Sequence, residues 1–560
     1  MKTGRLTLTF LFAACCALAQ TPSQSKLGSI SGTVTDATTQ QTITKAVVTL
    51  LDTKREGDEK DRSRTVTTDA TGHYEFKDVS AGRYVVSAAR PGFMDSSYGE
   101  NKARHKKRMV PVSLSEGQTL SGIDIKLQRG AVISGRVVNE DGDPISGAQL
   151  WAGQYRNIMG KRELLPSGYA QSDDRGEYRI HDLEPGEYYV SCNVDPRSGI
   201  VAAGSDNRAY PSIFYPNAVS AEAATPVKVA VGGEEVANFD LVAVPSHTVR
   251  GRVVGVDDPN VHIALVSAVS PWSANYGVGA TPSKDGSFEV KNVLPGKYWL
   301  TAFHFSEGKQ DIARKKITVA DTDLNAVTVS FEASNVEMHG SIRLLGNTTL
   351  DVTKISVNLV PAISPANSDD SEDDWKRMIY ARPGAIKKDG SFTITAEAGS
   401  RRVFAAAYSR FGGFEDWYLK SVFFGGRDVT DTGFSPSAGA DIQMFLSADG
   451  AEVSGVVTDK DGHPAPGATV VSIPEESRQS RRDLYTQTIA DQLGRFRLRG
   501  VAPGQYKVFA FDDLEDQSYY DPEFLKQYSS FARDVKVEEK GKYSIEVKTV
   551  VERESGKDTR

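Results

Sequence analysis

One pair of residues has the spacing of a metal-dependent hydrolase. His181 and Glu184 match the His-x-x-Glu pattern of zinc peptidases, and His247 follows later in the chain. The same four positions recur before a turn as Lys77 to Ser80, Lys291 to Leu294 and Arg499 to Ala502. We therefore interpret the match as the end of a strand. The chain has neither a Gly-x-Ser-x-Gly sequence nor a nucleotide-binding glycine loop, and we expect no catalytic residue, metal or cofactor.

Two charged runs and one cysteine are weaker candidates. The acidic run from Asp369 to Asp374 has the oxygen ligands that calcium prefers, but its spacing is not that of an EF-hand. The basic run from Lys102 to Arg108 could contact an anionic polymer, although a solvated loop is the commoner outcome. Cys192 lies in a strand-like run, so we interpret it as a buried small residue and not as a nucleophile.

Aromatic residues outside the core pattern, most of which flank the long loops, are the better functional lead. Exposed rings can stack on the faces of sugars, and loops on a rigid scaffold are where binding residues collect. The candidate ligand-binding residues are Trp151, Tyr155, Trp272, Tyr276, Trp375, Tyr519 and Tyr520, with Tyr169 and Tyr380 beside them. Trp299 follows a core tyrosine and should face outward. The alternative is that each ring covers the edge of its own small core.

These candidates are set in a repeat that recurs five times. Each unit opens on a strand with an apolar-x-Gly-x-Val or Ile sequence, at Gly32, Gly135, Gly251, Gly340 and Gly455. A turn with Asp and Gly before an aromatic residue follows, and then a Pro-Gly-x-Tyr or similar sequence. The motif residues are Gly72, Tyr74, Gly176, Tyr178, Gly186, Tyr188, Gly286, Phe288, Gly296, Tyr298, Gly494, Phe496, Gly504 and Tyr506. The fourth unit keeps Gly390 and Phe392 but lacks Pro-Gly-x-Tyr, so it is degenerate.

Each motif residue has a mechanical explanation. Glycine permits a positive φ in the turn, and the Asp side chain can accept hydrogen bonds from turn amides. The aromatic residue after the turn is expected to fill the core, where it buries much apolar area. The tyrosine after Pro-Gly is expected to pack inward with its hydroxyl bonded to backbone, like the tyrosine corner of sandwich domains.

Together these motifs resemble the carboxypeptidase regulatory-like domain, a transthyretin-like β-sandwich related to Cna B-type and starch-binding-like folds. The resemblance is strong in units 1, 2 and 5, fair in unit 3 and weak in unit 4. It implies a secreted bacterial protein made of antiparallel, Ig-like β-sandwich modules. We expect an all-β chain with modules at 28–128, 131–244, 247–333, 336–448 and 451–550. No peptidase domain accompanies them, so the family's activities cannot be carried over to particular residues.

The N-terminus has the pattern of a secretory signal peptide over residues 1–19. Lys2 and Arg5 precede an apolar stretch, and Ala17-Leu18-Ala19 is a small-x-small cleavage site. A fainter lipoprotein pattern ends at Cys15. Cleavage would leave Cys192 as the remaining cysteine, so no intramolecular disulfide is expected. We expect a mature protein in the periplasm or outside the cell, with no membrane segment after signal cleavage.

The bulk numbers fit a soluble array of modules. The 560 residues carry a net charge of −7, which is weak for this length and argues against nucleic acid as a partner. We therefore expect a non-enzymatic binding or scaffold protein of the cell envelope, with polysaccharide or envelope proteins as partners. The alternative is a structural spacer or protein-interaction rod without a sugar ligand. The short segments between units favour a semi-rigid rod on the order of 150 Å long. The oligomeric state stays open.

Overall fold

The computed structural model describes residues 26–53, 62–100, 109–158, 161–194, 208–256, 260–267, 278–306, 309–331, 335–346, 350–361, 386–397, 401–407, 417–514 and 517–551. The regular structure is nearly all β, as the sequence predicted. The predicted signal peptide, the acidic run, the basic run, Trp272, Tyr276, Trp375 and Tyr380 lie outside the described residues.

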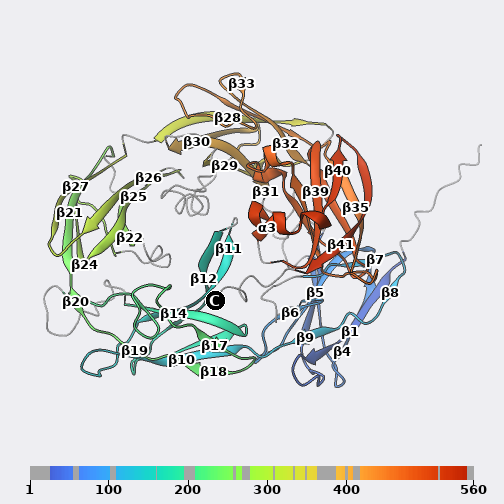
Figure 1. The fold of residues 1–560 in the computed structure, drawn as a ribbon, viewed down its shortest axis with the longest axis horizontal. Helices are drawn as coiled ribbons and strands as arrows, with labels where there is room; N and C mark the ends of the chain where they lie inside the picture. The colour runs from blue at the N-terminus through green and yellow to red at the C-terminus, as the bar shows by residue number, and fades with distance from the viewer. Residues whose placement is uncertain are drawn as a thin grey trace, which may run out of the picture.

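The described strands pack around five main apolar clusters, and we call each cluster with its strands a unit. The units follow a closed path (Figure 1). The first strand of each unit belongs to an apolar cluster of its own. The fifth unit, drawn in red, lies beside the first, drawn in blue (Figure 1). The semi-rigid rod is therefore wrong. The short connections between units bend the array instead of extending it, so that its two ends meet. The module boundaries given above stay a prediction.

The first unit has two sheets around one core. Its strands are β1 (Gly28–Asp36), β2 (Val47–Asp52), β3 (Ser63–Thr67), β4 (His73–Val79), β5 (Gly82–Ala89), β6 (Ser96–Ser97), β7 (Val112–Leu114), β8 (Thr119–Leu120) and β9 (Ile125–Leu127). One sheet has the order β4-β1-β8, with β9 also paired to β1, and the other has the order β3-β2-β5-β6, with β7 also paired to β5. Alternate residues of β1 are buried, as expected for a sandwich strand.

The second unit repeats this plan with a longer hairpin. Its strands are β10 (Ala131–Val138), β11 (Gln149–Ile158), β12 (Lys161–Gln171), β13 (Glu177–Leu183), β14 (Gly186–Asn193), β15 (Arg208–Ala209), β16 (Ile213–Phe214), β17 (Val227–Val229), β18 (Glu234–Val236), β19 (Phe239–Asp240) and β20 (Val244–Pro245). The β11–β12 hairpin points toward the centre of the closed path (Figure 1).

The third and fourth units follow the same plan, in which the first strand pairs with the last. The third contains β21 (His247–Val254), β22 (Val261–Ser267), β23 (Val278–Ala280), β24 (Ser287–Val293), β25 (Gly296–Ser306), β26 (Lys309–Val319) and β27 (Leu324–Ser330). The fourth contains β28 (Asn335–Leu345), η4 (Val352–Lys354), β29 (Ile355–Pro361), β30 (Ser391–Glu397), β31 (Arg401–Ala407), β32 (Tyr418–Phe424), β33 (Arg427–Asp428) and β34 (Ile442–Ser447).

The fifth unit carries extra helical turns. It contains β35 (Ala451–Thr458), β36 (Thr469–Pro474), η5 (Glu476–Arg478), η6 (Arg482–Leu484), β37 (Thr486–Ile489), β38 (Arg495–Val501), β39 (Gly504–Asp513), η7 (Ser518–Tyr520), α3 (Pro522–Gln527), η8 (Ser529–Phe531), β40 (Arg533–Val537) and β41 (Lys542–Val551). The α-helical turn α3 begins on Pro522 at its first position, and the 3₁₀ turn η8 follows it.

One feature departs from a purely antiparallel sandwich. In each unit the first strand pairs in parallel with a strand at the unit's end: β1 with β9, β10 with β19, β21 with β27, β28 with β34 and β35 with β41. β1 and β10 also pair in parallel with β8 and β18, and each first strand has one antiparallel partner.

The repeated strand glycine permits this parallel pairing. A Cβ built on Gly135 would lie 2.1 Å from the carbonyl oxygen of Ala237, and one on Gly32 would lie 2.1 Å from that of Ile123. The hydroxyl of the motif aromatic donates to the same carbonyl, from Tyr178 to Ala237 and from Tyr74 to Ile123. Glycine is therefore required because the neighbouring strand and the aromatic edge occupy the place of a side chain.

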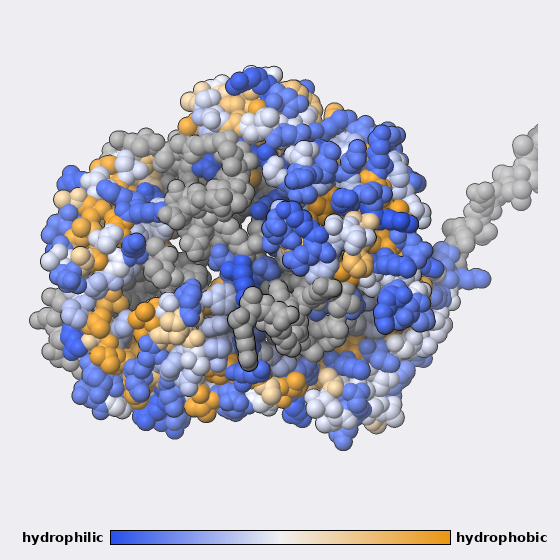
Figure 2. Space-filling model, viewed as in Figure 1, coloured by the Kyte–Doolittle hydropathy of each residue, from blue (hydrophilic) through white to orange (hydrophobic). Residues whose placement is uncertain are grey.

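The surface carries both hydrophilic and hydrophobic residues. Hydrophilic residues cover much of every unit on the face shown in Figure 2, and hydrophobic residues lie in separate smaller areas. Across the described part of the chain, no helix combines the length and apolar character needed to cross a membrane.

Candidate ligand-binding face

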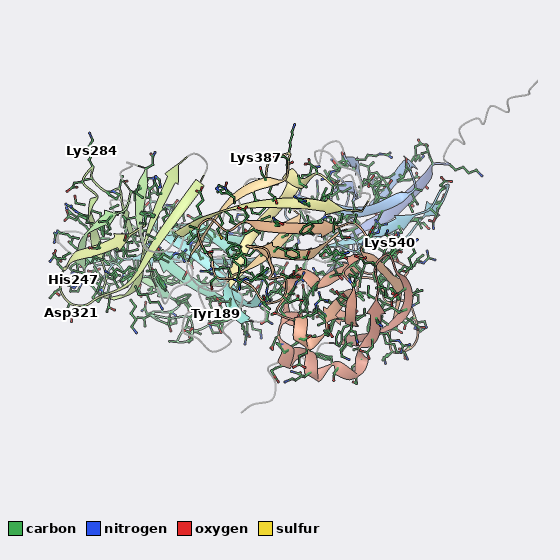
Figure 3. The ribbon with its side chains drawn as sticks, turned by 90° about the horizontal axis from the view of Figure 1, so that it is seen from above. Tyr189, His247, Lys284, Asp321, Lys387 and Lys540 are labelled. Carbon is green, nitrogen blue, oxygen red and sulfur yellow. The ribbon has the colours of Figure 1, made fainter. Side chains whose placement is uncertain are left out.

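The second unit presents an aromatic face on the outside of its β12-β11-β14 sheet. On β11, Leu150 and Ala152 point into the core. Trp151 therefore points away from it, and its cross-strand partners are Tyr169 on β12 and Ser191 on β14. On β14, Tyr188 is a core residue, so its neighbour Tyr189 lies on the outer side. Figure 3 labels Tyr189 beside these strands.

Two ring pairs make up this face, which we call the β11–β14 aromatic face: Trp151, Tyr155, Tyr169 and Tyr189. The ring centroids of Trp151 and Tyr169 are 4.5 Å apart with planes tilted by 47°. Those of Tyr155 and Tyr189 are 5.1 Å apart, edge to face at 83°. The exposed Arg162 places its guanidinium 5.2 Å from the centroid of Tyr155. Aromatic pairs and cations over rings each stabilise such a face modestly.

The β11–β14 aromatic face is partly exposed to solvent and partly packed against the second unit. Tyr169 is 44% exposed, while Trp151, Tyr155 and Tyr189 are half-buried. Tyr155 and Tyr189 pack on a small apolar cluster that includes Leu164 and Phe214. Burial, and then the negative charge of Glu222, raise the pKa of the Tyr155 hydroxyl, which therefore stays protonated at neutral pH. The face thus offers flat, neutral rings with a cation at one side.

The two predicted rings of the fifth unit have a different role. Tyr519 is only 5% exposed and belongs to an apolar cluster with Tyr485 and Phe511. The prediction of an exposed Tyr519 is therefore wrong, because the turns after β39 fold back over the sheet and bury this ring. Tyr520 is half-buried beside the same cluster, and the guanidinium of Arg482 lies 4.9 Å from its ring centroid.

Sequence reasoning missed Tyr189 although the signal was present. Tyr298 and Trp299 in the third unit occupy the same positions as Tyr188 and Tyr189, and Trp299 was expected to face outward by alternation. Trp299 is half-buried on β25, with the ammonium of Lys316 4.7 Å from its ring centroid. The same alternation applied to Tyr188 would have identified Tyr189.

The residues with zinc-peptidase spacing lie at a recurrent distortion of the sheet. Asp182, between His181 and Glu184, has a left-handed φ of 57°, and Asp78 and Asn292 have φ values of 54° and 58° at the equivalent positions. The first strand shifts register opposite this point. His181 is exposed and contacts its neighbour Asp182. This recurrence supports the interpretation of the match as a strand end.

The thiol and the turn carboxylates have structural environments. Cys192 is buried in the core, and burial raises the pKa of its thiol, which disfavours the nucleophilic thiolate. The carboxylate of Asp173 accepts hydrogen bonds from the amides of Arg175 and Glu177, and Asp459 does the same for Asp461 and His463. Within the described ranges, no three His, Cys, Asp or Glu side chains form a group that could hold a metal.

Known structures resemble parts of this chain only distantly. The Bacillus anthracis TIE protein is 13% identical over 55% of this chain and 51% of its own, with a TM-score of 0.16, so the chain spans about half of that protein. GBS52, the minor pilin of Streptococcus agalactiae, is 14% identical over 39% of this chain and 97% of its own, with a TM-score of 0.23. BcpA, the major pilin subunit of Bacillus cereus, is 11% identical over 55% of this chain and 100% of its own, with a TM-score of 0.13. No curated protein sequence matches the chain.

A family model gives the firmer comparison. It describes the carboxypeptidase regulatory-like domain and matches residues 29–128 and 452–548, which cover nearly all of the first and fifth units. The second, third and fourth units lie outside the matched residues. Two regions of this chain therefore match the carboxypeptidase regulatory-like domain, the family that their strand, turn and tyrosine motifs indicated.

Proposed function

We propose that this chain is a secreted, non-catalytic binding and scaffold protein of the cell envelope, and that polysaccharide binds the β11–β14 aromatic face. The observation that carries the proposal is the Trp151–Tyr169 pair, which lies on the outer side of a sheet whose inner side is core. Sugar rings have apolar faces made of C–H groups, and these lose their contact with water by stacking on aromatic rings.

The scaffold part of the proposal rests on how the repeated residues are used. The motif glycines and aromatics close each unit's core, and the turn carboxylates hold their own backbone amides. The polar residues that recur from unit to unit thus stabilise the fold of each unit. The regulatory-like family match in the first and fifth units agrees with a non-enzymatic role.

A direct test is retention of the purified mature chain on insoluble polysaccharides and cell-wall sacculi, with soluble sugars as competitors. We expect Trp151→Ala and Tyr169→Ala to weaken retention about tenfold, equivalent to about 1.4 kcal/mol each. Phe531→Ala is the matched control, because Phe531 is a 50% exposed ring in the fifth unit. Retention unchanged by both β11–β14 variants would reject this face as the site.

Protein recognition is the second candidate, and a specific edge favours it. β26 is an eleven-residue strand at the end of the order β23-β22-β25-β26, so one of its sides has no neighbour among the described strands of that sheet. Exposed edges accept extended peptide segments as added strands. Absence of retention on every polymer, together with capture of an envelope protein that Pro substitution in β26 abolishes, would favour this function.

A further inference from the structure

The two ends of the array touch where a turn of the fifth unit meets the edge of a sheet in the first. The side-chain amide of Gln492 in the fifth unit accepts from the N–H of Ser113 at 2.9 Å and donates to the C=O of Ser113 at 2.8 Å. Ser113 is the middle residue of β7, which pairs only with β5 among the named strands. Gln492 therefore offers this edge one hydrogen-bond acceptor and one donor, as the backbone of an added strand would.

Two further contacts lie beside the Gln492–Ser113 pair, and we call the three together the closing contact. The Arg83 guanidinium on β5 donates to the C=O of Ile489 at the end of β37, at 3.1 Å. The turn at Gly467 lies against Val110, because a Cβ built on Gly467 would approach Cγ2 of Val110 to 2.9 Å. Seen from above, the fifth unit projects to one side of the other units (Figure 3). The closing contact thus joins two different surfaces, one from each end of the chain.

Gln492 occupies a position that the repeat leaves free to vary. It is the second residue of the shared turn, where the other units have Ala70, Asp174, Lys284 and Lys388. All four of these are exposed, whereas Gln492 is half-buried. Figure 3 shows Lys284 projecting away from the third unit. The fifth unit has therefore adapted a solvent-facing turn position to recognise the first unit.

The closing contact is small and polar compared with the joint between the fourth and fifth units. That joint has a shared apolar cluster of Tyr418, Leu484 and Ala502, as well as the buried Arg481. Of the apolar clusters formed by the described residues, none combines side chains of the first and fifth units. The ends of the chain are thus held mainly by directed hydrogen bonds, which can break and re-form.

We propose that this contact also forms between chains, so that the fifth unit of one copy binds the β7 edge of the first unit of a second copy. A contact between two different surfaces closes a ring when both belong to one chain, and links copies head to tail when they do not. Closure within one chain is favoured by the high effective concentration of tethered ends. The closed form is then the resting state of an assembly subunit.

The test uses two variants of the full mature chain, each blocked at one end. Gln492→Glu places a carboxylate against the carbonyl of Ser113 and blocks the fifth unit's surface. Ser113→Pro removes the N–H that Gln492 binds, and an edge strand tolerates proline where that N–H points outward. The matched controls are Asp174→Glu, at the equivalent turn position of the second unit, and Lys228→Pro, at the equivalent strand position on β17.

We expect each blocked variant alone to be monomeric, with a larger radius of gyration by X-ray scattering than the wild-type chain. Mixing the two should give a 1:1 heterodimer of about twice the mass by light scattering, because one intact pair of surfaces remains. The control variants should stay closed and form no heterodimer when mixed. Blocked variants that open but stay monomeric on mixing would overturn the proposal, and so would variants that do not open. Neither result depends on polysaccharide binding, so the two proposals fail separately.

Discussion

The guanidinium of Arg481 in the fifth unit lies 3.1 Å from the carboxylate of Asp431 in the fourth, with its side chain only 2% exposed. The same guanidinium bonds Asp483 and donates to the carbonyl of Leu419. One buried cation thus joins β32 and a turn of the fourth unit to a turn of the fifth. Lys420 and Tyr418 add contacts to Glu539 across the same joint.

Removing this cation should loosen both units. Arg481→Ala leaves the Asp483 side chain, which is 6% exposed, without its buried partner, and we expect a loss of about 3–5 kcal/mol in unfolding free energy. Chemical denaturation followed by tryptophan fluorescence measures it, since Trp417 is buried beside this joint. The double variant Arg481→Met, Asp483→Leu should recover much of the loss because no unpaired charge remains buried. A single variant as stable as the wild type would contradict this account.

The tyrosines after Pro-Gly should not be equivalent. The hydroxyl of Tyr188 donates to the carbonyl of Glu184 at 2.7 Å, as those of Tyr84 and Tyr298 do to the carbonyls four residues before them. The buried hydroxyl of Tyr506 finds no hydrogen-bond partner among the described residues. We expect Tyr188→Phe to lower the unfolding free energy by about 1 kcal/mol and Tyr506→Phe to leave it unchanged or raise it. Equal losses of unfolding free energy in the two variants would contradict this difference between the tyrosines.

The strand glycine should be the least replaceable residue of the repeat. Gly135→Ala forces a Cβ to 2.1 Å from the carbonyl oxygen of Ala237, and we expect a loss of about 3 kcal/mol or more. Gly142→Ala is the control: its Cβ would meet nothing within 4 Å, and only its positive φ of 83° is strained, which costs about 1–2 kcal/mol. Thermal unfolding of both variants decides whether close approach or backbone strain causes the loss. An equal drop in melting temperature would exclude close approach as the cause.

Acid should weaken the units through their turns. Hydrogen bonds hold the pKa of the turn carboxylates below its usual range, from the Thr71 side chain to Asp69, from the Glu177 amide to Asp173 and from the His463 amide to Asp459. Such groups stabilise the fold above the unfolded-state pKa of about 4, and this contribution is lost as pH falls through the lower folded-state value. Denaturation midpoints should therefore drop between about pH 4 and pH 2. Replacing all three by Asn should flatten that drop, and an unchanged slope would assign it to other groups.

Local motifs predicted much of each unit and little of what joins the units. Turn glycines, motif aromatics and alternation act within about 100 residues of chain, and they specified the sandwich cores. The burial of Tyr519 depends on turns that fold back over β39, and the contact of Gln492 with Ser113 spans the whole array. Neither has a local signature, because both depend on how separate surfaces meet after the units have folded.

The parallel pairing of first and last strands also determines how each unit carries tension. The chain enters at the start of the first strand and leaves near the end of its parallel neighbour, so a pull on both ends slides the two strands past each other. All the hydrogen bonds between them are then loaded together in shear, instead of opening one after another. β35 and β41 are in register from Glu452 to Thr458, whereas β1 and β9 are in register from Val34 to Asp36. Stretched between two anchors, the first unit would yield before the fifth.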